Sequence, residues 1–357
     1  MTDDSRRIAV VLFNLGGPDS PDAVRPFLFN LFNDPAIIGA PGPVRWALAQ
    51  YISRRRAAVA RANYANMGGA SPLLPNTKTQ AQALQAALAG EGEVRCFIAM
   101  RYWHPFADET VRDVKAFGPD KVILLPLYPQ YSAATSGSSL DDWRRAARAA
   151  GLDVPTRTVC CYPDLPGFVE TTADLTAEAW SRAAQSGTPR ILLSAHGLPK
   201  KNITAGDPYQ WQVERSAAAV AAAITERLER EPDWLVTYQS RVGRLEWIRP
   251  YTENEVKRAA MDGCALVVVP LAFVSEHVET LVELDIEYRD VAERHGAPAY
   301  ERVGTVSEDS RFIEGLAGLV RGAIGPGPAI ECAGGGRLCP DEWSRCACAA
   351  TGGDGYG

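Results

Sequence analysis

The sequence lacks a hydrophobic run long enough to cross a membrane. Its longest apolar stretches, such as residues 267–274, have the length of a buried strand, whereas a membrane helix needs about 20 apolar residues. The first seven residues are polar and lack the apolar core of a secretory signal peptide. These two absences lead us to expect a cytoplasmic protein.

An excess of basic charge is also missing. Lys and Arg number 37 against 43 Asp and Glu, which gives a formal net charge of −6. General nucleic-acid-binding proteins carry a basic surface, so that class is disfavoured. No Gly-x-Gly-x-x-Gly follows the first apolar run and no Walker A motif occurs, so the sequence gives little support to nucleotide binding.

The chain does contain two successive sets of short apolar runs that alternate with amphipathic stretches. Hydrophobic residues make up 46% of the 357 residues, enough for a sizeable core. Expected strands cover residues 7–15, 94–99 and 121–127 in the first set, and 190–195, 234–239 and 265–270 in the second. This alternation predicts two doubly wound α/β halves with parallel sheets. The expected domains are residues 1–150, residues 151–324 and a cysteine-rich tail over residues 325–357.

A histidine follows the first strand of the second set. Ligands of parallel α/β proteins bind beyond the carboxyl ends of the strands, and His196 comes directly after the run at 190–195. A neutral imidazole at that edge can accept a proton or bind a metal. A loop histidine that hydrogen-bonds to the backbone is the alternative.

Carboxylates recur along the helix expected over residues 275–295. Glu279, Glu283 and Glu287 are spaced by four residues and share one helix face. Carboxylates on one face repel each other unless they are solvated or unless a cation or protons lie among them. A solvated face is therefore the alternative, but the position just after the strand at 265–270 favours a path for protons or metal.

Aromatic residues also cluster where strands end. Tyr102, Tyr128 and Trp247 could form the walls of a flat apolar ligand site, with core packing as the alternative for each of them. Residues 35–64 combine apolar side chains with an arginine triplet at 54–56. Such a segment could touch a membrane surface or receive an apolar acid, and the alternative is a surface helix with a basic end.

Cysteine is concentrated at the C-terminal end. Four of the eight cysteines lie in the last 32 residues. In a reducing compartment, such a cluster indicates metal binding before disulfides.

In order along the chain, these motifs resemble the ferrochelatase family over residues 9–320. The matching stretches are 14–18 (NLGGP), 68–72 (GGASP), 101–102 (RY) with 104–105 (HP), 128–132 (YPQYS), 135–139 (TSGSS), 194–196 (SAH), 206–209 (GDPY), 239–243 (QSRVG) and 275–281 (SEHVETL). The resemblance implies two Rossmann-like halves with a porphyrin cleft between them. It also implies a lyase that inserts Fe2+ into a porphyrin and releases two protons. The acidic chain with its cysteine tail favours protoporphyrin IX as the porphyrin, with protohaem as the product and the last step of haem biosynthesis as the reaction.

The resemblance also implies roles for individual residues. His196 and Glu279 match the inner metal-binding and proton-transfer site, and Glu283 and Glu287 match carboxylates that lead away from it along a π-like helix. Glu276 stands where the family often has Asp, and the charge is kept. We expect His196 to act mainly as the base and Glu279 to help deliver iron, with the reverse assignment open. The residues expected to contact porphyrin are Leu15, Arg55, Arg56, Tyr64, Ser71, Arg101, Tyr102, Tyr128, Trp247 and His277, with residues 35–64 as an apolar lip.

The tail resembles that of family members that carry a [2Fe–2S] cluster near the C-terminus. Cys339, Cys346 and Cys348 offer three close thiolates, and a cluster normally needs four. We expect Cys160 or Cys161 to be the fourth ligand, and Cys332 is the alternative. A structural zinc ion also accepts four thiolates and is the competing occupant.

Two other functions compete with this one. The first is a chelatase for coproporphyrin, for another metal or for another tetrapyrrole, and the second is a non-catalytic haem-binding protein. A base beside a row of carboxylates argues against the second. The expected partners are porphyrin and Fe2+, with peripheral contact to the inner face of a membrane as a further expectation, no nucleic acid and an open oligomeric state.

Overall fold

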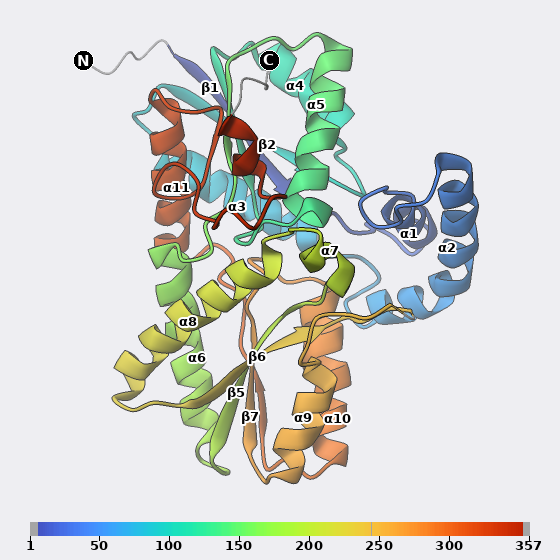
Figure 1. Cartoon of the computed structure of the whole chain (residues 1–357), viewed down its shortest axis with the longest axis vertical. Helices are drawn as coiled ribbons and strands as arrows, with labels where there is room; N and C mark the ends of the chain where they lie inside the picture. The colour runs from blue at the N-terminus through green and yellow to red at the C-terminus, as the bar shows by residue number, and fades with distance from the viewer. Residues whose placement is uncertain (1–5, 244, 353–357) are drawn as a thin grey trace. The chain divides into compact units, whose positions relative to one another are not determined.

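The computed structural model describes residues 6–243 and 245–352, so the last residues of the expected tail lie outside it. The described chain divides into two compact units, each built around its own sheet (Figure 1). The first unit takes in the described residues of Met1–Cys161, Leu316–Leu338 and Ala347–Gly357, and the second takes in Tyr162–Gly315 and Cys339–Cys346. Residues 150 and 324 as domain boundaries stay a prediction.

The first unit contains a five-stranded parallel sheet with the order β2-β1-β3-β4-β9. Its strands are β1 (Arg7–Asn14), β2 (Glu93–Met100), β3 (Lys121–Pro126), β4 (Thr156–Val159) and β9 (Ile330–Glu331). In the interior strand β1, seven of eight residues are buried, because both faces of a parallel sheet are covered. The last strand, β9, comes from the tail and pairs with β4.

Helices of the first unit connect and cover these strands. They are α1 (Val24–Phe32), α2 (Gly42–Ala65), α3 (Leu73–Ala87), α4 (Ala107–Phe117), the π-helix η1 (Ala133–Gly137) and α5 (Ser138–Ala150). The boundary between the units falls within α11 (Ser310–Ile324), and the 3₁₀-helix η3 (Ala347–Gly352) follows in the tail. No helix in the described ranges is long and apolar enough to cross a membrane.

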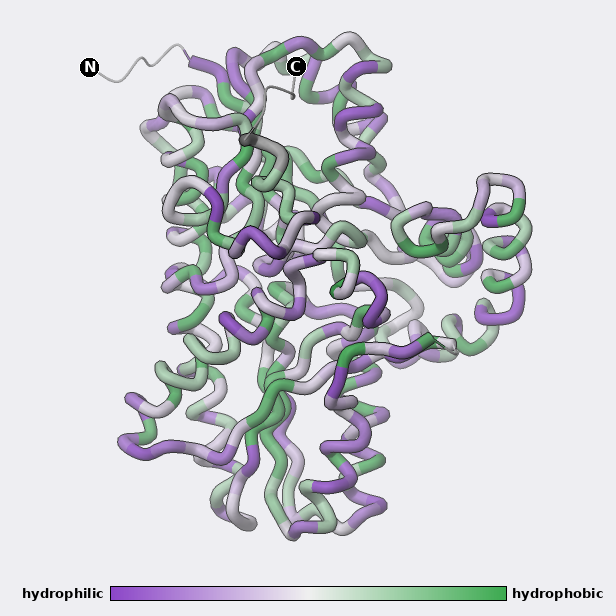
Figure 2. The backbone as a smooth tube through the Cα atoms, in the orientation of Figure 1, coloured by the Kyte–Doolittle hydropathy of each residue, from purple (hydrophilic) through white to green (hydrophobic). Residues whose placement is uncertain are grey.

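The second unit contains a four-stranded parallel sheet with the order β6-β5-β7-β8. Its strands are β5 (Pro189–His196), β6 (Asp233–Gln239), β7 (Ala265–Pro270) and β8 (Tyr300–Arg302). Its helices are α6 (Pro166–Ala183), α7 (Lys200–Thr204), α8 (Tyr209–Leu228), α9 (Thr252–Met261), the π-helix η2 (Glu279–Glu287) and α10 (Tyr288–Arg294). Figure 2 shows the strands of this sheet as hydrophobic. The prediction of two α/β halves with parallel sheets is confirmed.

The helix expected from Ser275 begins later and is not a regular α-helix. Its first nine residues, Glu279–Glu287, form the π-helix η2, and α10 continues it. Just before η2, the backbone N–H of His277 donates to Oγ1 of Thr280 at 3.0 Å. This N–H is therefore satisfied by a side chain and not by a backbone carbonyl of a helix. The π-helical turn agrees with what the resemblance implied, and π-helical turns are frequent at functional sites.

Candidate active site

His196 and Glu279 lie side by side in the second unit. His196 is the last residue of β5, and Glu279 is the first residue of η2. The Nε2 atom of His196 lies 3.4 Å from Oε1 of Glu279. Their side chains are 35% and 25% exposed, so both groups are open to an arriving substrate. The structure therefore brings together the two residues expected at the reaction centre.

Backbone contacts orient the imidazole of His196. Its Nδ1 lies 2.6 Å from the carbonyl oxygen of Gly197, so Nδ1 carries the proton and donates. The hydroxyl of Tyr209 donates to the carbonyl oxygen of His196 at 3.0 Å. With Nδ1 engaged in this way, the lone pair of the neutral ring is on Nε2, the atom that faces Glu279.

The two side chains shift each other's pKa in opposite directions. Burial lowers the pKa of His196, but the carboxylate of Glu279 outweighs burial, and the pKa rises to about 9. Burial raises the pKa of Glu279, but the positive charge of His196 outweighs it, and the pKa falls to about 2. At neutral pH the substrate-free site therefore holds an imidazolium next to a carboxylate.

His277 lies on the other side of Glu279 and stays neutral. Burial is the main cause that lowers the pKa of His277. Its Nδ1 accepts a hydrogen bond from the backbone N–H of Glu279 at 3.1 Å, and its Nε2 lies 4.0 Å from Oε2 of Glu279. The ring of Phe273 packs edge-on against it, with 4.7 Å between ring centroids. His277 thus supports the backbone at the start of η2.

Trp247 forms an aromatic wall next to His196. The two ring centroids are 6.5 Å apart at an interplanar angle of 52°, and Nε1 of Trp247 donates to the carbonyl oxygen of Val242 at 3.1 Å. Gly197 allows this approach, because a Cβ there would lie 3.1 Å from Cε3 of Trp247 and 2.8 Å from the carbonyl oxygen of Gln239.

The other carboxylates of the predicted path are not equivalent. Glu283 accepts hydrogen bonds from the backbone N–H of Ser240 at 2.8 Å and from the hydroxyl of Tyr288 at 2.8 Å. Glu276 forms an ion pair with Arg302 at 2.6 Å and accepts from the backbone N–H of Thr305 at 3.0 Å. Glu287, by contrast, is exposed.

In the first unit, Arg101 and Tyr102 are engaged in a buried polar network around Asp34. The Oδ2 atom of Asp34 lies 2.8 Å from Nη2 of Arg101, and it accepts hydrogen bonds from the hydroxyls of Tyr102 at 2.8 Å and Ser138 at 2.5 Å. Tyr102 is 1% exposed. Porphyrin contact by Arg101 and Tyr102 stays a prediction. Asp34 received no role from the sequence, since nothing there distinguishes it from a surface aspartate.

The remaining residues predicted to contact porphyrin lie in the first unit. Arg55 and Arg56 are exposed on α2, where Nη1 of Arg55 donates to the hydroxyl of Tyr51 at 2.8 Å. Ser71 and Tyr64 are buried, and Leu15 and Tyr128 are half-buried. Their contact with porphyrin also stays a prediction.

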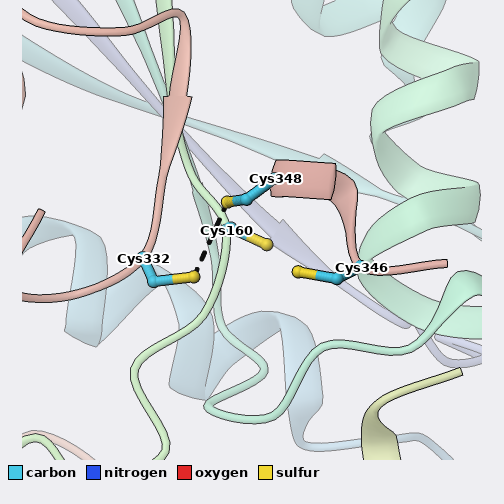
Figure 3. Close-up of side chains that lie close together, drawn as sticks. All are labelled: Cys160, Cys332, Cys346 and Cys348. Carbon is cyan, nitrogen blue, oxygen red and sulfur yellow. Dashed lines mark hydrogen bonds between the residues drawn. The ribbon is translucent and has the colours of Figure 1, made fainter. Parts of the chain in front are cut away.

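Four buried thiols gather around β4 and the tail. The Sγ atoms of Cys160, Cys332, Cys346 and Cys348 all lie within 4.8 Å of one another (Figure 3). Cys332 Sγ is 3.6 Å from Cys348 Sγ, and Cys161 Sγ lies 3.3 Å from Cys332 Sγ.

This set differs in part from the ligands predicted from the sequence. Cys160, Cys346 and Cys348 belong to both sets, and Cys332, the predicted alternative, completes the group. Cys339 is not one of the four, and its sulfur accepts a hydrogen bond from Nε2 of Gln212 at 3.0 Å. Four buried thiolates suit a metal ion or an iron–sulfur cluster.

Known proteins resemble this chain along nearly its whole length. The family model described as Ferrochelatase matches residues 7–324. The ferrochelatase of Caulobacter vibrioides is 54% identical over 347 residues, covering 96% of this chain and 98% of the relative. That of Phenylobacterium zucineum is 54% identical over 345 residues, with the same coverage. The structure of SirB from Bacillus subtilis with Fe3+ aligns at a TM-score of 0.48 and 12% identity, covering 89% of this chain and 95% of that one. On its family match and on relatives that share more than half of its residues along nearly its whole length, the chain belongs to the ferrochelatase family, enzymes that insert Fe2+ into a porphyrin.

Proposed function

We propose that the chain inserts Fe2+ into protoporphyrin IX with His196 as the base and Glu279 as the carboxylate that delivers iron. The observation that supports these roles most directly is the 3.4 Å approach of His196 Nε2 to Glu279 Oε1 at the carboxyl end of β5. Metallation must remove two protons from pyrrole nitrogens, and a single base within hydrogen-bond reach can accept one, release it to solvent and then accept the other.

The coupling between the two residues gives the reaction an order. Glu279 keeps His196 protonated at neutral pH, because its negative charge raises the pKa of the imidazole. A divalent cation bound at Glu279 neutralises that charge, so the pKa of His196 falls and Nε2 loses its proton. Iron arrival thereby prepares the base: the carboxylate of Glu279 holds Fe2+, and the lone pair on Nε2 of His196 is free to accept a pyrrole proton.

Single substitutions at the pair test the roles of the two residues. In the His196→Ala variant we expect the rate of iron insertion to fall at saturating porphyrin, because the imidazole that accepts the pyrrole protons is gone. In Glu279→Gln we expect the apparent KM for Fe2+ to rise, since an amide binds a cation more weakly than a carboxylate. The matched control is His295→Ala, because His295 lies at the end of α10 and contacts the carbonyl oxygen of Val291. Normal rates in His196→Ala would disprove the base assignment.

The choice of protoporphyrin IX rests on charge. The chain has a formal net charge of −6, and protoporphyrin carries two carboxylates where coproporphyrin carries four. A more acidic substrate is repelled more strongly by an acidic protein. Anaerobic Fe2+ insertion measured side by side with both porphyrins tests this choice. A higher kcat/KM with coproporphyrin would reverse it.

We also propose that Cys160, Cys332, Cys346 and Cys348 hold a [2Fe–2S] cluster. The support is the donor set: four buried thiols that lie within 4.8 Å of one another. When bound, such a cluster supplies a one-electron redox centre. The residues themselves hold the tail against the chain around β4.

Spectroscopy of purified protein tests the cluster and its ligands. Anaerobically purified, porphyrin-free protein should show visible absorption from the cluster, and a colourless sample with stoichiometric zinc would contradict it. Cys332→Ser should lose that absorption, whereas Cys339→Ser should keep it. The opposite result would assign Cys339 as the fourth ligand.

For the cellular location, we propose the cytoplasm, with α2 touching a membrane surface. Val44, Trp46 and Tyr51 of α2 are each more than half exposed, and Arg55 and Arg56 are exposed on the same helix. Figure 2 shows hydrophobic and hydrophilic residues alternating along it. Apolar side chains beside arginines suit an anionic bilayer surface. Co-sedimentation with anionic but not neutral vesicles is expected, and a Trp46→Ala, Tyr51→Ala double variant should bind less. If the same amount of protein pelleted with and without anionic vesicles, the membrane contact would be contradicted.

A further inference from the structure

Gln239 is a buried amide that touches both sides of the reaction centre. It is the last residue of β6, lies directly opposite His196 in the parallel register, and is 1% exposed. Its backbone carbonyl accepts a hydrogen bond from the N–H of Gly197 at 2.9 Å. The residue that follows His196 is therefore held by the main chain of Gln239.

The side chain of Gln239 reaches across to the π-helix η2. Its Nε2 donates to the carbonyl oxygen of Glu279 at 3.2 Å and to Oε2 of Glu283 at 3.2 Å. Its Oε1 accepts from the hydroxyl of Ser194 on β5 at 2.9 Å. Because Oε1 of Gln239 accepts on one side and the two N–H groups of its Nε2 donate on the other, the side-chain amide has a single orientation.

Buried neighbours support this orientation from both ends. The hydroxyl of Ser194 contacts Oγ1 of Thr252 at 2.9 Å, and Thr252 contacts Oγ1 of Thr237 at 2.9 Å. All three side chains are fully buried. At the other end, Glu283 is held by Tyr288 and by the backbone N–H of Ser240, a residue with a φ of 64°. A left-handed serine is unfavourable by itself, so the carboxylate of Glu283 stabilises the turn that leaves β6.

We propose that Gln239 is a positioning residue that sets the separation between His196 and Glu279. It links the strand end that carries His196 to the first carbonyl of η2, which carries Glu279, through one rigid amide. Glu283 then acts as the anchor of this amide rather than as a carrier of protons. The proposal rests on the roles proposed for His196 and Glu279. It concerns the alignment of these residues, which influences the chemical step more than porphyrin binding.

Two near-isosteric substitutions test the proposal. Gln239→Glu keeps the acceptor for Ser194 but loses both donors and places a charge next to Glu283, and Gln239→Met removes all three hydrogen bonds. We expect kcat for iron insertion to fall about 10- to 100-fold in both variants, as it does for other residues that orient a reacting group without touching the substrate. The porphyrin dissociation constant, measured by fluorescence quenching without metal, should change less than about twofold, because the walls of the site stay in place.

Controls separate positioning from folding and from the proposed function. Gln210→Glu is the matched control, because Nε2 of Gln210 also donates to a glutamate, Glu214, but lies outside this network. If the Gln239 variants fail to fold, Ser194→Ala takes their place, because it removes the hydrogen bond to Oε1 of Gln239 and should lower kcat with porphyrin binding unchanged.

Two outcomes overturn the proposal. One is a kcat within about twofold of wild type in a folded Gln239 variant, and the other is a loss of porphyrin binding that matches the loss of kcat. A His196→Ala variant assayed in parallel distinguishes the two failures: normal activity there refutes the proposed base, whereas an inactive His196→Ala with active Gln239 variants refutes only the positioning role.

Discussion

At the scale of single residues, the site depends on two charges that stabilise each other. The pKa of His196 rises to about 9 and that of Glu279 falls to about 2, although burial opposes both charges. Each shift is therefore due mainly to the partner, with smaller contributions from Glu283 and the Gly197 carbonyl at His196 and from His277 at Glu279. Removing one partner should leave burial opposed only by these smaller contributions.

This coupling predicts how the rate depends on pH. Because His196 must lose a proton before it can act as a base, kcat/KM for Fe2+, which reports the iron-free enzyme, should increase with pH and level off above the pKa of the imidazole, about 9. In Glu279→Gln the carboxylate that raises this pKa is gone and burial, which lowers it, remains. The rising limb should then move to lower pH. Anaerobic pH–rate profiles of both proteins check the prediction, and an unmoved limb in Glu279→Gln would contradict the coupling.

A second residue-scale prediction concerns Gly197. A Cβ at this position would lie 2.8 Å from the carbonyl oxygen of Gln239 and 3.1 Å from the ring of Trp247. We expect Gly197→Ala to displace the Trp247 ring, lower kcat/KM and destabilise the fold by about 1–3 kcal/mol, as overpacking does. Urea unfolding and tryptophan fluorescence measure both effects. Gly318→Ala is the control, since nothing lies within 4 Å of its Cβ, and it should be at least as stable as wild type.

At the scale of elements, the π-helix η2 is held at its start by a clamp to β8. Arg302, the last residue of β8, pairs with Glu276 at 2.6 Å and with Asp285 at 3.5 Å. Glu276 also accepts from Oγ1 of Thr280 at 2.6 Å. With these partners, Glu276 fits the role of a support for the helix start better than that of a metal ligand, and its place on the metal path stays a prediction.

The clamp predicts a specific loss of stability. Arg302→Met keeps the length of the side chain but leaves Glu276 half-buried without its cation, which should cost about 2 kcal/mol of unfolding free energy. Chemical denaturation measures the loss. Arg182→Met removes an ion pair to Glu301 in which the arginine side chain is 54% exposed, and it should cost less than about 1 kcal/mol. Equal effects in the two variants would argue against the clamp.

At the scale of the whole molecule, the tail is bound through backbone pairing and through thiols. β9 extends the first sheet by pairing with β4, and Arg157 forms an ion pair with Glu331 next to that pairing. Cys332 follows β9 directly and belongs to the four-thiol group (Figure 3). A metal centre there would fasten the tail at a second point.

Removal of the metal centre should therefore loosen the tail. Metal binding to a site that forms only in the folded chain adds to folding stability. We expect protein stripped of metal under reducing conditions to melt at a lower temperature and to be cleaved by protease within residues 325–352 before other segments. Calorimetry and mapping of the cleavage products check this expectation, and identical behaviour of loaded and stripped protein would contradict it.

Much of the fold could be predicted from local pattern. The predicted strands at 190–195, 234–239 and 265–270 agree with β5, β6 and β7 within one residue at each end. Buried parallel strands are continuous apolar runs, so their limits are visible in the sequence. The π-helical start of η2 has no such pattern, because it depends on side-chain contacts from Thr280 and Glu276.

The candidate site was predictable only where a residue's chemistry is distinctive. A histidine at a strand end and a glutamate after the next strand are recognisable, and the sheet brings them together. Gln239 and Asp34 are ordinary polar residues in the sequence, and their importance comes from being buried with several partners each. The sequence favoured Cys339 over Cys332 as a ligand, and the path of the tail instead places Cys332 in the four-thiol group.

By itself, the sequence determined the alternating α/β organisation, the choice of His196 and Glu279 as the proposed reaction centre, and a thiol-rich tail, because hydrophobic period and residue chemistry are local properties. Tertiary structure decided the 3.4 Å pairing and its opposed pKa shifts, the contacts on which the proposed supporting roles of Gln239, Glu283 and Arg302 rest, and the membership of Cys332 in the thiol group. These features depend on distances between segments far apart in the chain. Such distances exist only after the chain has packed, and so does the burial that strengthens the interactions between the charges.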